Sequence, residues 1–388
     1  MTRLLSLLAP ALVLLALALP GHAFETRAKS AFVVDVTTGT VLLNKNADIP
    51  LPPASMSKLM TIYVAFEAIR DGRLALDERL PVSRNAMSYG GSTMFLDTTD
   101  RPTVEDLLRG IIVTSGNDAT AVIAEALSPD GTEAGFARFM TRRAAQMGMT
   151  NSTFKNSNGW PAEGHVMSMR DLALLSRRLI EDFPEFYPIF SETEFKFDGR
   201  APQNTRNRNP LLKLGIGADG LKTGYTPAAG YGLAGSAVQK GRRVIFVISG
   251  LQSAQARAEE AEAIINWAFR QFVEKTVVTS GKRLAEADVW MGEVPKVGLT
   301  VAEDLRTLIP AIGSEEITGE LVYTSPIRAP IAKGDELGEL VFSPADLPET
   351  RVKLVAAEDV ARGGFMARMR TVSELLLTRL QQGPEGAL

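Results

Sequence analysis

The sequence predicts an α+β fold, with helices on a mainly antiparallel sheet, followed by a small all-β domain and a C-terminal amphipathic helix. Three observations support this prediction. Residues 31–43 contain an apolar strand pair, the next section repeats apolar residues at helical spacing, and residues 221–275 contain three strand patterns and a long helix. A strand pair, a helical middle and a strand–strand–helix ending are typical of a sheet covered by helices.

The composition is that of a globular protein. The chain has 388 residues, of which 45% are hydrophobic and 22% charged, and its formal net charge is −3. This length is enough for two or three domains. Acidic and basic residues are interspersed, so the sequence offers no electrostatic footprint for nucleic acid, and we expect none to bind.

Residues 1–23 have the pattern of a secretory signal peptide. A basic start precedes an apolar run over residues 4–19, and small residues at Gly21 and Ala23 indicate cleavage after Ala23. The run is short for a membrane span, and an uncleaved anchor is the alternative. The chain has no cysteine, so the exported form has no disulfide and no lipid on an N-terminal cysteine. We expect a protein of a bacterial periplasm or cell-wall space.

The first domain is expected over residues 24–275. It begins with strands at 31–35 and 40–43, which flank a tight turn. After three prolines a helix is expected from Ser55, because apolar residues recur there at helical spacing until Asp71-Gly72.

Three further helices are expected in the middle of this domain. A capping pattern at Thr103 starts one helix, which ends at Thr114. The next runs through Leu127, so Ser115-Gly116-Asn117 is expected on a turn between two apolar helices. The last of the three runs from about Met169.

Strands are expected again at 221–226, 231–238 and 244–249. The run 244–248 is continuously apolar, as in a central strand that is covered on both faces. A long helix over about 254–275 is expected to close the domain.

From about residue 276 short apolar segments alternate with Gly, Pro and Asp, which predicts a small all-β domain over 276–362. It carries no catalytic motif, so we expect a spacer or a partner surface. The tail, 363–388, contains an amphipathic helix over 365–381 with arginines beside its apolar stripe. We expect this helix to lie on a membrane surface. Docking on the β-domain and a dimer contact are the alternatives.

Three short motifs predict a serine acyl-transfer site: Ser55-Met56-Ser57-Lys58, Ser115-Gly116-Asn117 and Lys222-Thr223-Gly224. Each motif alone is common. All three in this order, each beside a segment of suitable predicted structure, are a specific signal for a serine acyl-transfer site. Ser55 and Lys58 are three positions apart at a helix start, so the amine can reach the hydroxyl. Lys58 must be neutral to accept a proton, and burial and the charge of Lys222 are the expected causes of a lowered pKa.

A histidine base is the alternative mechanism. Only His22 and His165 exist, and His22 leaves with the signal peptide. His165 ends the polar turn Ala162-Glu163-Gly164-His165 and is expected on the surface. The sequence therefore favours the serine–lysine mechanism over a Ser–His–Asp triad.

The second motif supplies two further groups. We expect Ser115 to relay a proton between Lys58 and a leaving amine. Asn117 is expected to fix Lys58 and to donate to a substrate amide.

The third motif is expected on a strand, where Lys222 and Thr223 point to opposite faces. Gly224 is expected to let a substrate backbone approach closely. The backbone N–H groups of Ser55 and Tyr225 are expected to form an oxyanion hole. Each such donor lowers the activation barrier by roughly 3 kcal/mol in comparable enzymes.

Around these motifs the chain resembles the low-molecular-mass penicillin-binding proteins. It is most similar to the serine D-alanyl-D-alanine carboxypeptidases with a C-terminal β-domain and an amphipathic anchor. The resemblance covers nearly the whole mature chain, and the segments that carry it are 53–58, 113–119 and 220–226, together with Ser92-Thr93-Met94-Phe95 and Arg206-Asn207-Arg208-Asn209.

This resemblance implies a β-lactamase/transpeptidase-like domain and a role for each motif residue. Ser55 is the acylated nucleophile, Lys58 the proton acceptor and Ser115 the proton relay. Lys222 and Thr223 bind the terminal carboxylate, and Arg208 helps to hold it, since a buried carboxylate needs cationic partners. Close relatives often have His at the position of Tyr225, so only the backbone role of Tyr225 carries over.

The resemblance also implies the substrate, a peptidoglycan stem peptide ending in D-Ala-D-Ala, and β-lactams as covalent inhibitors. It places the enzyme in the periplasm, on the outer face of the inner membrane. A β-lactamase is one alternative, but Gly116 in place of the usual Asp, and the lack of an evident Glu to activate water, count against it. A D,D-endopeptidase and a wall-binding or β-lactam-binding scaffold with weak turnover are the others. No metal or other cofactor is expected, because the chain has no cysteine and no histidine cluster.

Overall fold

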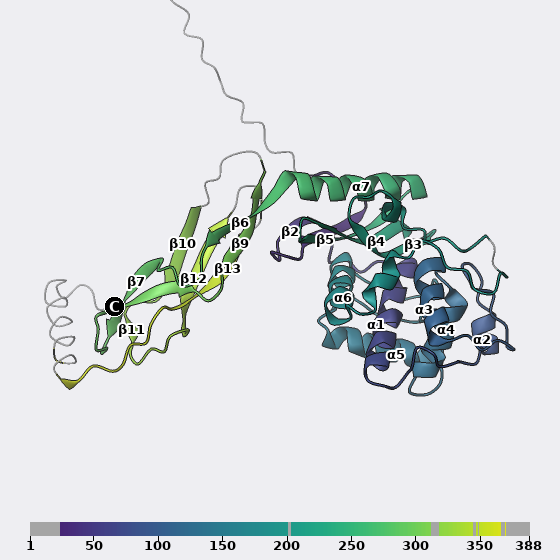
Figure 1. Ribbon diagram of the computed structural model, residues 1–388, viewed down its shortest axis with the longest axis horizontal. Helices are drawn as coiled ribbons and strands as arrows, with labels where there is room; N and C mark the ends of the chain where they lie inside the picture. Colours follow the sequence, from purple (N-terminus) through teal and green to yellow (C-terminus); the bar gives the residue numbers. More distant parts are fainter. Residues whose placement is uncertain are drawn as a thin grey trace, which may run out of the picture.

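The computed structural model describes residues 24–200, 203–311, 318–343, 347, 349–365 and 369. The expected signal peptide, 1–23, lies outside the described residues, as does the expected helix over 365–381 apart from Phe365 and Met369. Figure 1 shows two bodies side by side along the longest axis, one of helices around a sheet and one built of strands. Within the described residues no helix is both long and apolar enough to cross a membrane.

The first body contains a five-stranded antiparallel sheet, in the order β2-β1-β5-β4-β3. Its strands are β1 Ser30–Asp35, β2 Val41–Lys45, β3 Ala218–Thr226, β4 Gly230–Gln239 and β5 Arg242–Leu251. The N-terminal strand pair joins the later strands through β1 and β5, in a register that pairs Val33 with Phe246. The strand order confirms the predicted antiparallel sheet and its apolar central strand. It also places β3, which carries the third motif, at an edge of the sheet.

Helices and short helical turns surround this sheet. They are η1 Ala54–Ser57, α1 Lys58–Arg70, α2 Arg84–Met87, α3 Val104–Arg109, η2 Gly110–Thr114, α4 Asn117–Leu127, α5 Glu133–Gln146, α6 Met169–Asp182, η3 Tyr187–Ser191, η4 Pro210–Lys213 and α7 Ala254–Gln271. The capping box predicted at Thr103 is present, with Asp106 as its second member.

The two faces of the sheet have separate cores. Ile245 and Val247 of β5 pack with α1, α4 and α6, whereas Val244, Phe246 and Ile248 pack against α7. Neighbouring residues of a strand point to opposite faces, so one continuous apolar run serves both cores. Each of these side chains contributes about 1.5–3 kcal/mol through burial. Figure 1 shows α7 alone along one face and the other helices along the opposite face.

Several boundaries differ from the sequence predictions. The helix expected from Ser55 starts with the short turn η1, and the helix from Thr103 ends as the π-helix η2. The helix α5 was not anticipated. The long helix expected to reach Lys275 stops at Gln271, because residues from Phe272 onward pair with a strand of the second body.

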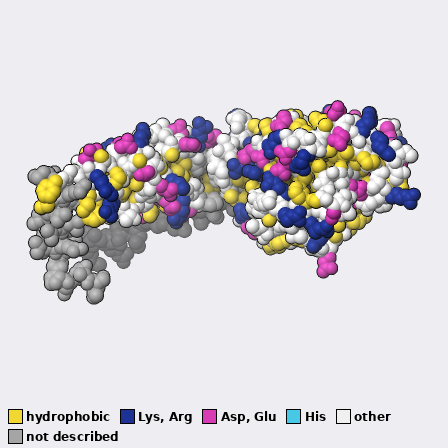
Figure 2. Space-filling model, turned by 90° about the horizontal axis from the view of Figure 1, so that it is seen from below, with side chains coloured by type: hydrophobic (Ala, Val, Ile, Leu, Met, Phe, Trp, Pro, Cys, Tyr) yellow, Lys and Arg dark blue, Asp and Glu magenta, His cyan; other side chains and the backbone are white. Residues whose placement is uncertain are grey.

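The second body is all-β, as predicted. A six-stranded sheet has the order β10-β12-β13-β8-β7-β11, and β6 pairs with β9. The strands are β6 Phe272–Val278, β7 Ala285–Trp290, β8 Lys296–Val301, β9 Leu305–Pro310, β10 Thr318–Tyr323, β11 Ile327–Arg328, β12 Glu336–Ser343 and β13 Thr350–Ala356. This body has its own apolar core, which includes Leu299, Leu354 and Val360. Figure 2 shows basic and acidic side chains intermixed over the described parts of one face.

A buried arginine connects the end of α7 to the sheet. Arg242 of β5 donates to the carbonyl oxygens of Ala268 and Phe272, and its Nε lies 2.8 Å from Asp35 Oδ2. Both side chains of this ion pair are buried. The arginine therefore fixes the point at which α7 passes into β6.

Candidate active site

Ser55 and Lys58 lie together at the start of α1. Lys58 Nζ is 2.9 Å from Ser55 Oγ and 2.7 Å from the carbonyl oxygen of Asn158. The Lys58 side chain is completely buried. The i,i+3 spacing thus brings the amine to the hydroxyl, as the sequence analysis expected, and the Asn158 carbonyl holds the amine from the other side.

The pKa of Lys58 is lowered to about 7, first by burial and second by the positive charge of Arg208. Asp118 and Glu133 oppose this shift. The lowered pKa and its first cause, burial, were expected, and the charge of Arg208 is a further contribution. A lysine with a pKa of about 7 is partly neutral near pH 7, and the neutral form can accept a proton.

Ser115 and Lys222 form a second pair. Ser115 ends η2 in a left-handed conformation, with φ 64°, and its Oγ lies 2.9 Å from Lys222 Nζ. Lys222 is buried, and burial followed by the charges of Lys58, Arg208 and Arg257 lowers its pKa well below the ordinary value. The neighbouring Thr223 lines the open cleft. Lys222 therefore holds Ser115 by a hydrogen bond, while the buried Thr223 lines the cleft.

Asn117 occupies a different place from the one expected. Its Nδ2 donates to the carbonyl oxygen of Gly90 at 2.8 Å, and its backbone N–H donates to the carbonyl oxygen of Ser92. Among the described contacts none joins Asn117 to Lys58, and the second hydrogen bond of Lys58 goes to the Asn158 carbonyl. Asn117 lines the cleft and holds the 90–92 segment beside it.

Gly224 has a packing role that was not expected. It lines the cleft, but a Cβ at this position would lie 3.0 Å from the carbonyl oxygen of Pro53 and 3.2 Å from Ala54 Cβ. The missing side chain therefore lets β3 pack closely against η1, which brings the third motif beside Ser55.

His165 is buried, so the prediction of a surface residue was wrong. Its Nε2 lies 2.8 Å from Ser57 Oγ, and its Nδ1 accepts from the backbone N–H of Lys155 at 3.3 Å. Burial, followed by the charge of Lys58, lowers its pKa to about 4. Its partner is Ser57 and not Ser55. The contact fixes the 155–165 segment, which carries the Asn158 carbonyl, to the start of α1.

Two arginines lie at one end of the cleft. Arg208 donates to the carbonyl oxygen of Thr114 and to Asn204 Oδ1, both at 2.9 Å. Arg257 of α7 is buried, donates to the carbonyl oxygen of Arg208, and has an Nε without a hydrogen-bond partner in the described structure. Arg257 was not among the site residues predicted from the sequence. Its position four residues before the buried Ala261 of α7 was the available signal.

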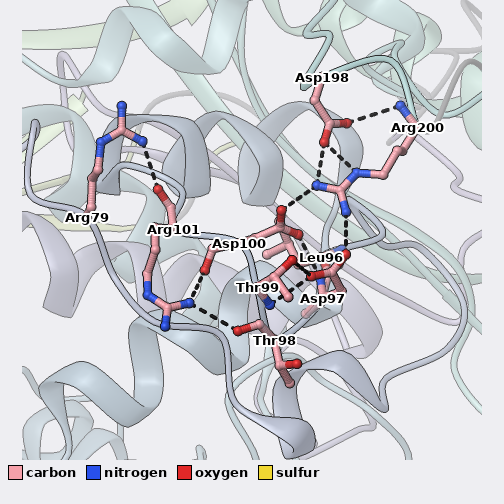
Figure 3. A network of polar contacts seen from close by, with 10 residues as sticks. Arg79, Leu96, Asp97, Thr98, Thr99, Asp100, Arg101, Asp198 and Arg200 are labelled. Carbon is pink, nitrogen blue, oxygen red and sulfur yellow. Dashed lines mark hydrogen bonds and ion pairs between the residues drawn. The ribbon is translucent and has the colours of Figure 1, made fainter.

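Arg200, eight residues before Arg208, is the centre of a network of polar contacts. Arg200 pairs with Asp97 at 2.9 Å and with Asp100 at 2.6 Å, and it also contacts Asp198. Figure 3 shows the Arg200 guanidinium between these carboxylates, which come from two segments about 100 positions apart. This network joins the segment before Arg208 to the loop that follows Ser92.

The cleft between these groups has a volume of about 560 Å³, and its lining includes Ser55, Asn117, Arg208, Thr223 and Tyr225. Trp160 is 45% exposed and lines the cleft, as does Tyr225, which is 51% exposed and stacks on Tyr231 with ring centroids 4.1 Å apart. The side chain of Tyr225 thus covers one wall, in addition to the backbone role expected for it. Within the described residues no cluster of His, Cys, Asp and Glu could hold a metal ion.

The site contains a serine that is hydrogen-bonded to a buried lysine of lowered pKa, and a second serine–lysine pair lies beside it. This arrangement defines a serine hydrolase of the serine–lysine class. Comparison with known proteins identifies the family. The model of the D-alanyl-D-alanine carboxypeptidase family, peptidase S11, matches residues 18–253, and that of the C-terminal domain of penicillin-binding protein 5 matches residues 272–362. The chain belongs to this family of low-molecular-mass penicillin-binding proteins.

Individual relatives cover most of the chain. The D-alanyl-D-alanine carboxypeptidase DacC of Escherichia coli is 34% identical over 351 residues, which are 88% of this chain and 86% of the relative. DacD of Salmonella typhimurium is 35% identical over 345 residues, 87% of each chain. The solved structure of penicillin-binding protein 5 from Haemophilus influenzae is 31% identical, with a TM-score of 0.75 over 87% of this chain and 98% of the other.

Proposed function

We propose that this enzyme removes the terminal D-alanine from peptidoglycan stem peptides that end in D-Ala-D-Ala, through an acyl-enzyme on Ser55. The observation that carries the proposal is the 2.9 Å contact between Ser55 Oγ and the buried Lys58 Nζ, whose pKa is lowered to about 7. A neutral amine at this distance can take the hydroxyl proton as the oxygen attacks.

In the first step Ser55 Oγ attacks the carbonyl carbon of the last peptide bond, and its proton passes to Lys58 Nζ. Ser115 Oγ, held by Lys222, hands a proton on to the leaving nitrogen. The C–N bond breaks and D-alanine departs, which leaves an ester on Ser55. Water then hydrolyses the ester and returns the proton to Ser55. The backbone N–H groups of Ser55 and Tyr225 are the proposed donors to the oxyanion, worth roughly 3 kcal/mol each.

The leaving end of the substrate carries a carboxylate. Thr223 and Arg208 line this end of the cleft, with Lys222 buried behind them. We propose that these groups bind the carboxylate, because desolvated carboxylates require charge-assisted hydrogen bonds. A β-lactam presents a similar carboxylate and an amide carbonyl. Its leaving nitrogen stays tethered to the acyl group, so the acyl-enzyme is expected to persist.

The proposed location is the periplasm, at the outer face of the inner membrane. The signal peptide, 1–23, and the amphipathic tail, 363–388, support this proposal from the sequence. The catalytic domain would occupy 24–275 and the β-domain 276–362. Loss of the tail, by truncation before Gly363, is expected to release the protein from sedimenting membranes. A truncated protein that still sediments would contradict the anchor.

The reaction is tested by incubating the purified protein with an N-acylated tripeptide ending in D-Ala-D-Ala and measuring free D-alanine. We expect release by the wild type and by the surface control Ser191→Ala, and none by Ser55→Ala. Absence of release by the wild type would contradict the function. Rapid turnover of benzylpenicillin without peptide hydrolysis would favour a β-lactamase. Cleavage of cross-linked peptides in preference to the tripeptide would favour an endopeptidase.

A further inference from the structure

A carboxylate of α5 connects two segments that border the cleft. Glu133, the first residue of α5, accepts from the backbone N–H of Ser157 at 3.0 Å and from Ser157 Oγ at 2.5 Å. Its other oxygen accepts from Tyr89 Oη at 2.6 Å. Tyr89 directly precedes the 90–92 segment, and Ser157 directly precedes Asn158. Glu133 itself does not line the cleft, so it touches the site only through these two segments.

The peptide between Ser157 and Asn158 is held from both sides. On one side α1 supplies two donors: Thr61 Oγ1 donates to the Ser157 carbonyl oxygen at 2.6 Å, and Lys58 Nζ donates to the Asn158 carbonyl oxygen at 2.7 Å. On the other side Glu133 accepts from the N–H and the hydroxyl of Ser157. Ser157 is completely buried. The position of the Asn158 carbonyl relative to Lys58 therefore depends on the Glu133 carboxylate.

The surroundings of Glu133 suit a charged carboxylate. All of its described partners donate, including Asn85 Nδ2 at 3.5 Å, and an ionised carboxylate only accepts. Burial, followed by the bond to Glu133, raises the pKa of Tyr89, so this hydroxyl remains a neutral donor. None of these partners is a cation, so no ion pair within the described residues neutralises the charge.

A local role at the start of α5 does not account for these contacts. An acidic residue in the first turn of a helix interacts favourably with the helix dipole. The cap of α5 is Thr132, whose hydroxyl accepts from the N–H of Gly135. Glu133 instead binds residues that lie 24 and 44 positions away in the sequence. Its side chain thus serves the tertiary structure around the cleft.

The charge of Glu133 also acts on Lys58. The charged and titratable groups that interact with Lys58 come from separate parts of the chain, and they are Asp118, Glu133, His165, Arg208 and Lys222. Arg208 lowers the pKa of Lys58, whereas Asp118 and Glu133 raise it. His165 is uncharged near pH 7, because its pKa is lowered to about 4. Loss of the Glu133 charge should therefore lower the pKa of Lys58 further.

We propose that Glu133 is a positioning residue for the base, because it holds the Ser157–Asn158 peptide that binds the Lys58 amine. This inference rests on the proposed function, to which it adds a residue outside the three motifs. Glu133 has two separable effects, one through its hydrogen bonds and one through its charge. Glutamine at this position keeps an acceptor oxygen for Ser157, and its amide can donate to the Tyr89 hydroxyl oxygen, but it carries no charge.

The test is the pH profile of the rate of acylation by benzylpenicillin, measured for three variants. Glu133→Gln should keep the limiting rate at high pH within about twofold of the wild type and move the midpoint to lower pH by about 0.5 pH unit, as expected for loss of one partly screened charge. Glu133→Ala should lower the limiting rate at least about tenfold, because small displacements of catalytic groups are costly.

Glu125→Gln is the matched control. Glu125 accepts from the same Asn85 at 2.9 Å and from Ser83 Oγ, and it has no contact with Ser157. This variant should keep both the midpoint and the limiting rate. An unchanged midpoint in Glu133→Gln, or an equal shift in Glu125→Gln, would overturn the role of Glu133, as would a wild-type limiting rate in Glu133→Ala. No acylation of the wild type at any pH would contradict the proposed function itself.

Discussion

The Asn158 carbonyl oxygen accepts a hydrogen bond from Lys58 Nζ at 2.7 Å, beside the 2.9 Å contact between Lys58 Nζ and Ser55 Oγ. A carbonyl can accept from an ammonium or from a neutral amine. In the neutral state this bond can use one N–H of Lys58 and leave the nitrogen lone pair for the Ser55 hydroxyl. Asn158 thus acts as a positioning residue through its backbone, and the segment that carries it is fixed by the contact between His165 and Ser57.

The first prediction concerns the pH dependence of acylation. Because the pKa of Lys58 is about 7, the rate of acylation by benzylpenicillin is expected to rise with pH, with a midpoint near 7. Arg208 contributes to the lowered pKa through its charge, so Arg208→Gln should move the midpoint to higher pH. The measurement is the pH profile of the acylation rate, with Arg206→Gln as control. A midpoint that stays in place in Arg208→Gln would contradict the electrostatic role of Arg208.

The lowered pKa of Lys58 should also make the stability of the protein depend on pH. Between about pH 7 and the ordinary lysine value of 10.5, the unfolded chain holds a proton on Lys58 that the folded protein has lost. The free energy of unfolding should therefore rise with pH across this window, and Lys58→Met should reduce the slope. Urea denaturation of both proteins at several pH values measures the free energy of unfolding and hence this slope. An equal slope in both proteins would argue against a lowered pKa.

A third prediction concerns His165. Its pKa is lowered to about 4 from the ordinary 6.5, so the folded protein resists a proton that the unfolded chain accepts. Stability should be lost as the pH falls from 6.5 to 4, by an amount on the order of 3 kcal/mol. His165→Gln should flatten this dependence. It should also lower stability near pH 7 by about 1–3 kcal/mol, because the buried Ser57 Oγ and Lys155 N–H lose their partner. Unchanged stability near neutral pH would show that the contact does not hold the segment.

The buried pair of Arg242 and Asp35 gives a fourth prediction. Removing one partner leaves a buried charge unpaired, so Arg242→Met or Asp35→Asn alone should cost about 3–5 kcal/mol. The double variant should cost clearly less than the sum of the two single variants. Chemical denaturation of the four proteins completes the cycle. Additive losses would mean that the pair does not interact.

How much of the site the sequence predicts depends on the distance between its residues along the chain. Ser55 and Lys58 are three residues apart, so helical spacing alone brings them together. Ser115 and Lys222 are 107 positions apart, and the order of the three motifs along the chain, not a local spacing, predicted that they share one site. Arg257 was missed because arginine is ordinarily a surface residue, although its i,i+4 relation to the buried Ala261 placed it on the buried face of α7.

The incorrect predictions for His165 and for the end of α7 have the same physical cause, a contact with a residue that is distant in the sequence. His165 follows the exposed residues 162–164, so its local sequence is that of a surface turn. Its hydrogen bond to Ser57 and its ring contact with Phe154 join it to residues outside that turn. In the same way α7 was expected to continue to Lys275, because its apolar pattern extends past Phe272. The pairing of Phe272 with Pro310 ends the helix, and that contact is not visible in the local sequence.

The central claim, that Ser55 is the acylated nucleophile and Lys58 its base, is tested most directly by the mass of the intact protein after brief exposure to benzylpenicillin. We predict one covalent adduct, mapped to the peptide that contains Ser55, in the wild type and in Ser191→Ala. Ser55→Ala should gain no mass, and Lys58→Met should be acylated at least about 100-fold more slowly, in line with loss of a general base. An adduct that persists in Ser55→Ala, or acylation of Lys58→Met at the wild-type rate, would contradict the account.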